Sequence, residues 1–354
     1  MATVTVQQDV PIVERNVVLV EGKNKSDWDR FVQESPGVIA WHGYEWSDIL
    51  KRHHGAEFYP LATYDGPRIC GILPLYRIRT LRGEALISVP YFVAGGIVAA
   101  ESEVQQALLK KAIEMSQRLK IAHITFKQYK ARLDGPLLTD DHYYNRELTL
   151  SPDINQIWQS ISPFNQSKIE ESRKYDPDFE YPSSNVWGFY KLLLHDQHAA
   201  GVPCVSKAWV QRLFDTGMYE IALLKHNGEL VAGTMVKKFR DTVSFPFSCL
   251  RDQSDKTELF AYALYWKLIT TLATTGIRIA HSGRIPETDE TFRYRLGWGG
   301  TKYSYYYQYY GLGEGKTEFS NKRGRKRQII EAVWKRMPVS VARAIGPIVV
   351  RQYP

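Results

Sequence analysis

The segment HSGRIPETDETFRYRLGWGG, residues 281–300, carries the side chains of this sequence best suited to chemistry. His281 can accept or donate a proton, because the ordinary pKa of imidazole lies close to neutral pH. Arg284 follows an apolar strand pattern and a glycine, a loop position at which binding groups concentrate. Arg295 adds a planar cationic fork that suits phosphate or carboxylate. The segment therefore favours a catalytic set of His281, Arg284 and Arg295 that handles an anion and a proton.

Structural roles remain open for two of these residues. His281 lies in the segment IAHS, which repeats an earlier IAHI that contains His123, and a shared packing role would explain both histidines. The guanidinium of Arg284 can instead form a surface ion pair with Glu287 or Asp289.

The elements that must position these residues occur twice in the chain. Gly66 and Gly71 recur as Gly228 and Gly233, each 162 residues later, and Trp46 recurs as Trp209 after 163 residues. A period of about 160 residues is too long for a solenoid repeat and suits two copies of a whole domain.

Each copy has the same expected order: a helix pair, a two-strand hairpin, a third strand, a long amphipathic helix and a short strand. The hairpins are expected around Asp65-Gly66 and Asn227-Gly228, dipeptides that are typical of tight turns. The glycine five residues after each turn predicts a bulge or a close backbone approach. The long helices are expected at about 103–119 and 257–275. The predicted fold class is α+β, with mixed, mostly antiparallel sheets flanked by helices.

Composition and charge set the class of protein. A chain of 354 residues with 44% hydrophobic and 24% charged residues has room for two globular domains. The net charge of +8 favours anionic partners. Three cysteines show neither metal-binding nor disulfide spacing, and the N-terminal residues lack a signal-peptide pattern. We therefore expect a cytoplasmic protein without a metal site.

The C-terminal part is basic and amphipathic. Residues 322–327 read KRGRKR, and the following residues interleave lysine and arginine with apolar side chains. Such a segment can lie on an anionic membrane surface, so a peripheral contact with the inner face of the cell membrane is expected through residues 322–354. The alternative is a tail that packs on the body of the protein.

Three stretches resemble the FemAB family, and in particular its branch associated with exosortase, PEP-CTERM and exopolysaccharide gene clusters. They are WHGYEWSDILKRHHGAEFYPLATYDGPRICGILPLYRI, SVPYFVAGGI and HSGRIPETDETFRYRLGWGG, and the likeness extends over roughly residues 20–312. The resemblance implies two tandem domains of the GNAT (Gcn5-related N-acetyltransferase) fold. It also implies an aminoacyltransferase that moves an amino acid from aminoacyl-tRNA to an amine of a bacterial cell-envelope precursor, without a tightly bound cofactor.

The resemblance also implies positions for the substrate. By likeness to the family's late motif, Tyr294 and Trp298 join the substrate-binding residues beside Arg295. In the GNAT fold a bulged third strand holds the acyl carbonyl, which implies substrate contacts at Phe247 and Ser248. In the first copy, the SVPYFVAGGI segment can bring backbone close to a ligand at Pro90, Gly95 and Gly96, or form only a tight turn.

Two departures from the family pattern affect these expectations. Arg295 stands where the family usually has lysine, which keeps the positive charge but changes its geometry. The linker carries Glu170 and Glu171 where family members often have an arginine-lysine pair, which weakens the expectation that this helix binds RNA.

Two alternative functions remain. An acyl-CoA-dependent GNAT N-acyltransferase, acting on a sugar or peptide amine, would carry an arginine and glycines before the long helix to bind pyrophosphate. The second copy has CLRDQSDKTELF there, without glycine, and the first has AGGIVAAESE, without the matching arginine. The other alternative is a non-catalytic protein that binds an envelope precursor.

The sequence thus predicts four regions. They are a first GNAT-like domain at 1–150, a helical linker at 151–184, a second GNAT-like domain at 185–312 and a basic amphipathic tail at 313–354. The predicted partners are aminoacyl-tRNA or acyl-CoA as donor and a lipid-linked or nucleotide-linked envelope precursor as acceptor.

Overall fold

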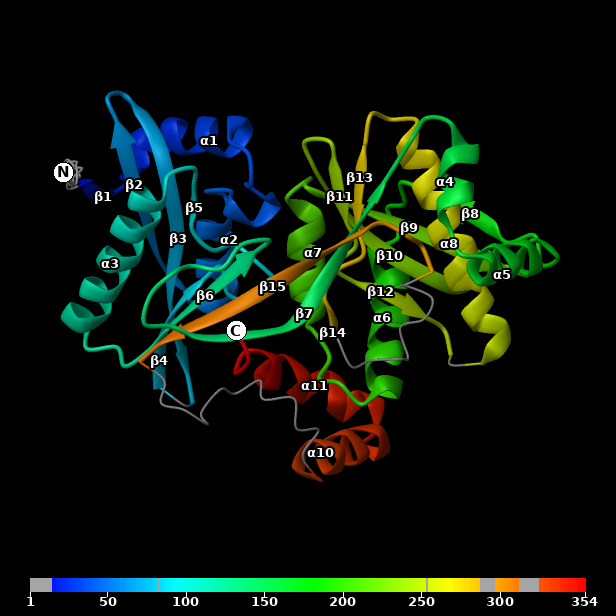
Figure 1. The fold of residues 1–354 in the computed structure, drawn as a ribbon. Helices are drawn as coiled ribbons and strands as arrows, with labels where there is room; N and C mark the ends of the chain where they lie inside the picture. The colour runs from blue at the N-terminus through cyan, green and yellow to red at the C-terminus, as the bar shows by residue number, and fades with distance from the viewer. Residues whose placement is uncertain (1–14, 82, 253, 287–296, 312–324) are drawn as a thin grey trace, which may run out of the picture.

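The computed structural model describes residues 15–81, 83–252, 254–286, 297–311 and 325–354. Two halves lie side by side, each with strands between helices, and the last two helices lie below them (Figure 1). The first half contains β1 (Val17–Leu19), η1 (Gly22–Asn24), α1 (Lys25–Glu34), η2 (Ala40–His42), α2 (Trp46–His54), β2 (Glu57–Asp65), β3 (Arg68–Thr80), β4 (Gly83–Ser88), β5 (Val98–Ala99), α3 (Ser102–Leu119), β6 (Ile124–Tyr129) and β7 (Leu138–Thr149).

The second half repeats this order of elements. Between the halves come α4 (Ile154–Ser160), α5 (Pro163–Arg173) and β8 (Asp178–Glu180). The second half then contains α6 (Val186–Ala200), α7 (Lys207–Asp215), β9 (Tyr219–His226), β10 (Glu229–Phe239), β11 (Thr242–Ser244), β12 (Ser248–Leu250), α8 (Asp255–Ala273), β13 (Ile279–His281), β14 (Ile285–Pro286) and β15 (Thr301–Tyr310). The duplication expected from the glycine spacing is therefore present in the structure.

All strands among the described residues belong to one sheet that runs through both halves. Its order is β1-β2-β3-β4-β6-β15-β7-β13-β11-β10-β9-β8, with β5, β12 and β14 paired at its sides. The parallel pairs are β4 with β6 and β11 with β13, at equivalent places in the two halves, and the other pairs are antiparallel. This confirms the α+β class with a mixed, mostly antiparallel sheet.

The two halves exchange their last strands. β7, which ends the first half in sequence, pairs with β13 of the second half. β15, which ends the second half, pairs with β6 of the first half and with β7. In Figure 1, β7 and the orange β15 run across the middle of the molecule between the halves. The boundaries predicted at residues 150, 184 and 312 stay predictions, but the exchange places these two strands against the other copy.

The repeated glycines mark close packing at equivalent places. Gly71 in β3 lies opposite Ala99, and a Cβ atom there would stand 2.5 Å from a side-chain carbon of Val104 in α3. Gly233 in β10 lies opposite Cys249, and a Cβ atom there would stand 2.9 Å from a side-chain carbon of Leu223. The expected close approach is thus confirmed in both copies.

Local sequence also explains the turns and helix ends. The second hairpin has Asn227 and Gly228 as its loop residues, both with positive φ angles of 53° and 79°. The first hairpin is shifted by one residue from the expectation, because Asp65 pairs with Arg68 and leaves Gly66 and Pro67 in the loop. Serine side chains cap α7 and α8 at Ser206 and Ser254.

The described part of the C-terminal tail contains α10 (Arg325–Arg336) and α11 (Val339–Val350), which pack against α6. Trp334 and Ala342 are buried in this contact, and Gly346 lies against the backbone of Cys204, where a Cβ atom would come within 2.6 Å of the carbonyl oxygen. The tail therefore packs on the body of the protein, which was the alternative to a membrane-bound tail. The helices in the described ranges are all too short or too polar to cross a membrane.

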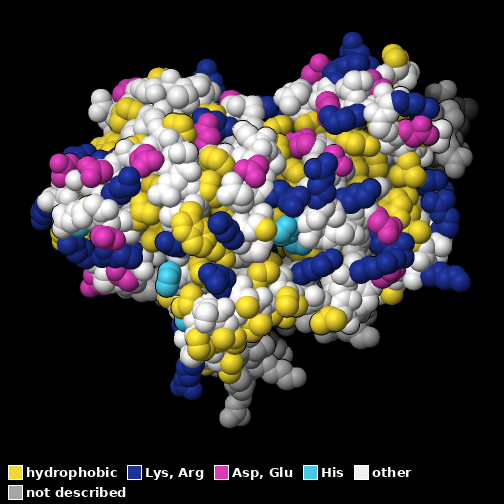
Figure 2. Space-filling model, turned by 180° about the vertical axis from the view of Figure 1, so that it is seen from behind, with side chains coloured by type: hydrophobic (Ala, Val, Ile, Leu, Met, Phe, Trp, Pro, Cys, Tyr) yellow, Lys and Arg dark blue, Asp and Glu magenta, His cyan; other side chains and the backbone are white. Residues whose placement is uncertain are grey.

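The outward side of the tail carries exposed apolar side chains. Val333, Val341, Ile348 and Tyr353 are exposed there. Hydrophobic side chains gather at the lower edge of the molecule in Figure 2, where these helices lie, with lysine and arginine beside them. Packing on the body thus leaves an apolar and basic face open to the outside.

Candidate functional site

A pocket of about 300 Å³, here called the central pocket, lies between the two halves. The first half contributes Ile39, Ala40, Trp41, Tyr91, Phe92, Val93 and Tyr129, and the second contributes Trp209, Tyr219, Thr242, Ser244, Phe245, Pro246, Phe247, His281, Ser282, Gly283, Arg284 and Tyr305. Aromatic side chains thus form about half of its wall, and polar side chains such as Thr242, Ser244 and Ser282 lie among them, a mixture that suits a binding site for small molecules.

Breaks in the third strand of each half form two facing parts of the wall. In the second half, β11 ends at Ser244 and β12 begins at Ser248, and the residues between them line the pocket. Pro246 lies in this break and has no N–H group, so it cannot continue the ladder of hydrogen bonds. In the first half, the chain leaves β4 through Val89 and Tyr91, both with positive φ angles.

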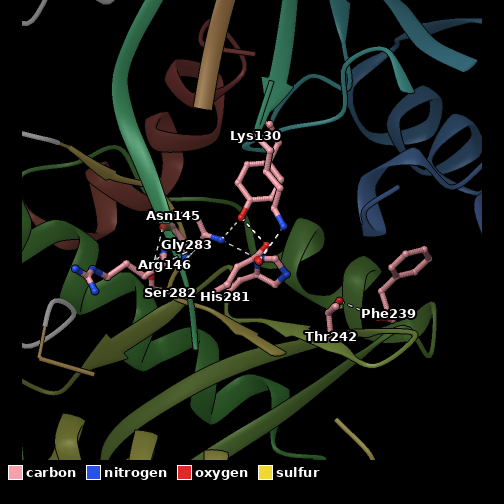
Figure 3. Close-up of polar contacts among 10 residues, drawn as sticks. Lys130, Asn145, Arg146, Phe239, Thr242, His281, Ser282 and Gly283 are labelled. Carbon is pink, nitrogen blue, oxygen red and sulfur yellow. Dashed lines mark hydrogen bonds and ion pairs between the residues drawn. The ribbon is translucent and has the colours of Figure 1, made fainter. Parts of the chain in front are cut away.

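His281 lies at the bottom of a hydrogen-bond network that Figure 3 shows. Its Nδ1 atom is 2.8 Å from Nδ2 of Asn145, a fully buried residue of β7. The Oδ1 atom of Asn145 accepts the backbone N–H of Gly283 at 3.2 Å. Because an amide N–H can only donate, this contact fixes the orientation of the Asn145 side chain. Nδ2 of Asn145 therefore donates to Nδ1 of His281.

This contact determines which nitrogen of His281 carries a proton. Burial lowers the pKa of His281 below its ordinary value, against an opposing effect of the nearby Glu147 carboxylate, so the imidazole is neutral at pH 7. A neutral imidazole whose Nδ1 accepts a hydrogen bond has its proton on Nε2. His281 thus offers a donor, not a basic nitrogen, at Nε2.

The neighbours of Asn145 hold it in place. Its Nδ2 atom also donates to the hydroxyl of Tyr129 at 2.6 Å, and this hydroxyl donates to Oε1 of Glu147 at 2.7 Å. Lys130 Nζ donates to the other carboxylate oxygen of Glu147 at 2.9 Å. Burial raises the pKa of Tyr129, which keeps its hydroxyl protonated for this role. The network joins β6 and β7 of the first half to β13 of the second.

Arg284 provides a positive charge in the central pocket. Its guanidinium lies over the ring of Tyr143 at 4.7 Å, and Nη1 is 3.5 Å from the hydroxyl of Tyr307. A second cation, Lys127 of β6, is buried, and its Nζ donates to the carbonyl of Phe92 at 3.0 Å. Burial, together with the charge of Arg284, lowers the pKa of Lys127 to about 7. A negatively charged ligand at Arg284 would relieve the repulsion between these two cations.

The other residues predicted from the second half separate in the structure. Phe247 lines the central pocket, as His281 and Arg284 do. Ser248 lies in β12, where its hydroxyl is 2.8 Å from that of Thr234, and it does not line the pocket. Trp298 is buried in the core of the second half, with its ring 4.4 Å from that of Tyr265. Tyr294 and Arg295 lie outside the described residues.

The predicted residues of the first half are closely packed against their neighbours, and their contact with a substrate stays a prediction. Pro90 is buried next to Tyr91, which does line the pocket. Gly95 has a φ angle of 149°, and a Cβ atom there would collide with Val89. A Cβ atom at Gly96 would collide with Gln128. These glycines allow the chain to turn closely, which was the alternative to ligand contact.

The sequence reasoning missed the strand that orients His281. Residues 147–150 read Glu-Leu-Thr-Leu, an alternation of polar and apolar side chains that could have identified the end of β7. Nothing local predicts that Asn145 is buried, or that the first-half residues Trp41 and Phe92 face His281 across a pocket. The described residues contain no group of three or more histidine, cysteine, aspartate or glutamate side chains that could hold a metal ion.

Comparison with known proteins identifies the fold. The sequence matches no family model and no curated protein. Among solved structures, FemX has a TM-score of 0.65 at 11% identity, with 83% of this chain and 96% of that chain covered. The C-terminal domain of a putative lysylphosphatidylglycerol synthetase from Agrobacterium fabrum has a TM-score of 0.54 at 10% identity, covering 82% and 92%.

A tandem GNAT protein from the clavulanic acid biosynthesis pathway has a TM-score of 0.51 at 11% identity, covering 83% of this chain and 97% of that chain. At identities this low the likeness concerns the fold alone. The predicted fold of two tandem GNAT-like units is therefore confirmed.

Proposed function

We propose that this protein is an acyltransferase of FemAB type, which transfers an aminoacyl or acyl group to an amine of a cell-envelope, peptidoglycan or exopolysaccharide precursor. The observation that carries this proposal is the meeting of three features in the central pocket. These are the Nε2–H donor of His281, the broken strand at Phe245–Phe247 and the cation of Arg284. The likeness of the fold to FemX supports it.

The pocket suits the charge that develops during acyl transfer. The amine nitrogen attacks the acyl carbon, an N–C bond forms, and the bond from that carbon to the donor oxygen or sulfur breaks. The carbonyl oxygen carries negative charge in between, and fixed donors stabilise it. Nε2–H of His281 and the amide groups of the strand break are the donors we assign. The amine gives its proton to solvent or to the departing group, because Nε2 of His281 already holds one.

Arg284 is assigned to an anionic group of a substrate. Both a nucleotide-linked or lipid-linked acceptor and a tRNA donor carry phosphates, and a guanidinium can bind a phosphate through two parallel hydrogen bonds. Because Arg284 lines the central pocket, its charge would lie close to a substrate that reacts there. From its sequence position we predict that Arg295 also binds an anionic group of a substrate.

The donor we favour is aminoacyl-tRNA over acyl-CoA. In a CoA site the backbone N–H groups at the start of the long helix hold pyrophosphate. At the start of α8, Ser254 already accepts the N–H of Thr257, and Asp255 and Glu258 would repel phosphate. At the start of α3, Glu103 adds a negative charge. These carboxylates argue against the CoA-dependent alternative.

We also propose that the acceptor is met at the inner face of the cell membrane. The apolar Val341 and Ile348 are exposed on one side of α11, and the basic side chains of Lys335, Arg336 and Arg343 are exposed elsewhere on the tail. Apolar residues that enter the lipid interface and cations that attract anionic headgroups act together in such contacts.

The proposal is tested by following a labelled group. Purified protein is incubated with radiolabelled aminoacyl-tRNA, or with radiolabelled acetyl-CoA, and with a mixture of nucleotide-linked and lipid-linked envelope precursors. We expect label from aminoacyl-tRNA to appear in a precursor. Transfer from acetyl-CoA alone would favour the CoA-dependent enzyme. Precursor binding without transfer from either donor would favour a non-catalytic binding protein.

A further inference from the structure

A second cavity of about 140 Å³, here called the tail chamber, adjoins the central pocket. The two cavities share Tyr91, Trp209 and Phe247 in their walls. The two cavities are therefore neighbours, with the side chains of Tyr91, Trp209 and Phe247 at their common border.

The far wall of the tail chamber belongs to the C-terminal tail. Pro347, Val350 and Tyr353 line it. Two hydrogen bonds join this part of the tail to the first half. The guanidinium of Arg351 donates to the carbonyl of His54 at 3.0 Å, and the hydroxyl of Tyr91 donates to the carbonyl of Arg351 at 3.1 Å. The chamber is thus formed jointly by both halves and by the tail.

The walls of the tail chamber carry no charge at neutral pH. None of the described residues that line it is a lysine, arginine, aspartate or glutamate. Burial lowers the pKa of His53 to about 4 and that of His54 to about 3, helped by neighbouring positive charges that include Arg351. Both imidazoles are therefore neutral, and the ring of His54 stacks on that of Tyr91 with their centres 3.6 Å apart.

One residue of this wall has a polar atom without a partner. Nε2 of His54 makes no hydrogen bond within the described part of the chain; the atom is itself buried, and the residue is 9% exposed. Leaving such an atom unpaired costs free energy, so a ligand group that reaches it gains free energy on binding. The volume also suits a ligand, since an apolar cavity of about 150 Å³ can bind benzene.

We infer that the tail chamber binds an uncharged, mainly apolar group of a substrate, of about the size of an aromatic ring and with one polar atom for His54. The inference rests on the proposed function in one respect: this group belongs to a molecule that reacts in the central pocket. Two sources share this chemistry, the side chain of the transferred acyl group and an apolar part of the acceptor.

The binding test uses 4-bromobenzyl alcohol, a ring with one hydroxyl. We expect anomalous diffraction from crystals soaked with it to place bromine between Trp209 and Val350, and titration calorimetry to give the affinity in solution. The neutral ring alcohol should bind more tightly than 4-bromobenzylamine, whose positive charge would be desolvated without an anionic partner beside Arg351. Bromine located elsewhere, or equal binding of the amine, would overturn the inference.

Two variants locate the contact. Val350→Trp fills the chamber and should weaken binding of the alcohol about tenfold or more, which is at least 1.4 kcal/mol. Val341→Trp places the same bulk on the exposed side of the same helix and should leave binding unchanged. His54→Phe keeps a ring but removes the polar atom, so it should abolish the preference for 4-bromobenzyl alcohol over 4-bromotoluene. Should Val350→Trp fail to fold, the His54→Phe comparison decides alone, and an unchanged preference contradicts the inference.

The source of the group follows from transfer assays. If the acyl side chain enters the tail chamber, Val350→Trp should reduce transfer from phenylalanyl-tRNA more than from glycyl-tRNA. If a part of the acceptor enters the tail chamber, transfer from both charged tRNAs should fall by the same factor, and the KM of the acceptor should rise. Binding of the bromine probe does not depend on either assay, so absence of all transfer would count against the proposed function alone.

Discussion

The side-chain amide of Asn145 lies 2.8 Å from Nδ1 of His281, although 136 residues separate them in the chain. The contact exists because β7 leaves the first half and pairs with β13, placing Glu147 opposite His281 and Asn145 just beyond it. One half thus supplies a pocket residue, and the exchanged strand of the other half sets its protonation. Neither half alone would contain the arrangement that we assign to the acyl oxygen.

The first prediction concerns this contact. In Asn145→Asp, a carboxylate oxygen accepts a hydrogen bond from Nδ1–H, so the proton of the neutral His281 lies on Nδ1 and the Nε2–H donor is lost. We expect kcat to fall by about 10²–10³ above the pKa of the variant's imidazole. At lower pH the imidazolium carries protons on both nitrogens, and activity relative to the native protein should recover. The measurement is kcat as a function of pH for both proteins.

Nitrogen NMR of labelled His281 provides the control for this prediction. The native protein should show Nε2 protonated, and the variant should show Nδ1 protonated at high pH. A native imidazole protonated on Nδ1 would contradict the assignment, and a constant ratio of the two kcat values across pH would mean that Asn145 acts only in packing.

The second prediction separates binding from stability at Arg284. Loss of a charged hydrogen bond of about 1.5–3 kcal/mol corresponds to a rise in KM of roughly 10- to 100-fold in Arg284→Ala. Its main structural contact is the ring of Tyr143, worth about 0.5–1 kcal/mol, so the melting temperature should change little. Arg284→Lys keeps the charge without the fork and should give an intermediate KM. A lowered melting temperature with unchanged KM would make Arg284 structural.

The third prediction concerns buried Lys127, whose pKa is lowered to about 7 by burial and by Arg284. Unfolded lysine has a pKa of about 10.4, so between these values the unfolded chain binds more protons and native stability rises with pH. The cost of burying the lysine is largest at pH 7 and below. Lys127→Met removes this cost, and we expect the variant to be more stable than the native protein at pH 7.

Urea denaturation at several pH values checks this prediction. The advantage of Lys127→Met should shrink by on the order of 1–3 kcal/mol between pH 7 and pH 9, as the native lysine becomes neutral. Other titrating groups are common to both proteins and cancel in the difference. An advantage that grows with pH would contradict the lowered pKa.

The fourth prediction concerns the donor. Because Asp255 and Glu258 lie at the start of α8 and Ser254 caps it, acetyl-CoA should bind weakly. Titration calorimetry should give a dissociation constant near or above about 1 mM, or −4 kcal/mol. Micromolar affinity, about −8 kcal/mol, would instead favour the CoA-dependent enzyme.

The fifth prediction concerns the membrane. Val341 and Ile348 lie seven residues apart on the exposed face of α11, so aspartate at both should abolish sedimentation with phosphatidylglycerol vesicles. Phe164→Asp, at an exposed apolar position in the linker helix α5, is the matched control and should bind as the native protein does. Equal binding of both variants would exclude this face of the tail.

Substitution tests the tail better than deletion does. Trp334 and Ala342 are buried against the body, so removing residues 320–354 would expose the α6 surface that they cover. The packed tail also forms a wall of the tail chamber. A deletion would therefore combine loss of membrane binding with loss of stability.

Sequence by itself determined the local elements and their duplication. Strand and helix periods, the turn at Asn227-Gly228 and the matched glycines depend on neighbouring residues, so they can be read along the chain. His281 and Arg284, predicted from the sequence, and Phe247, implied by the resemblance, line one pocket in the structure, and their roles stay predictions.

Only the tertiary structure decided how the two copies combine. Pairing between strands far apart in sequence depends on which partners meet in space, and no local pattern predicts that β7 and β15 exchange places. Asn145 reads as an ordinary polar strand residue and becomes a buried partner of His281 through that pairing. The family resemblance assigns Trp298 to the substrate site, whereas the structure buries its ring in the core of the second half. A large aromatic side chain gains free energy from burial in a core as well as in a binding site, so its type alone does not distinguish the two.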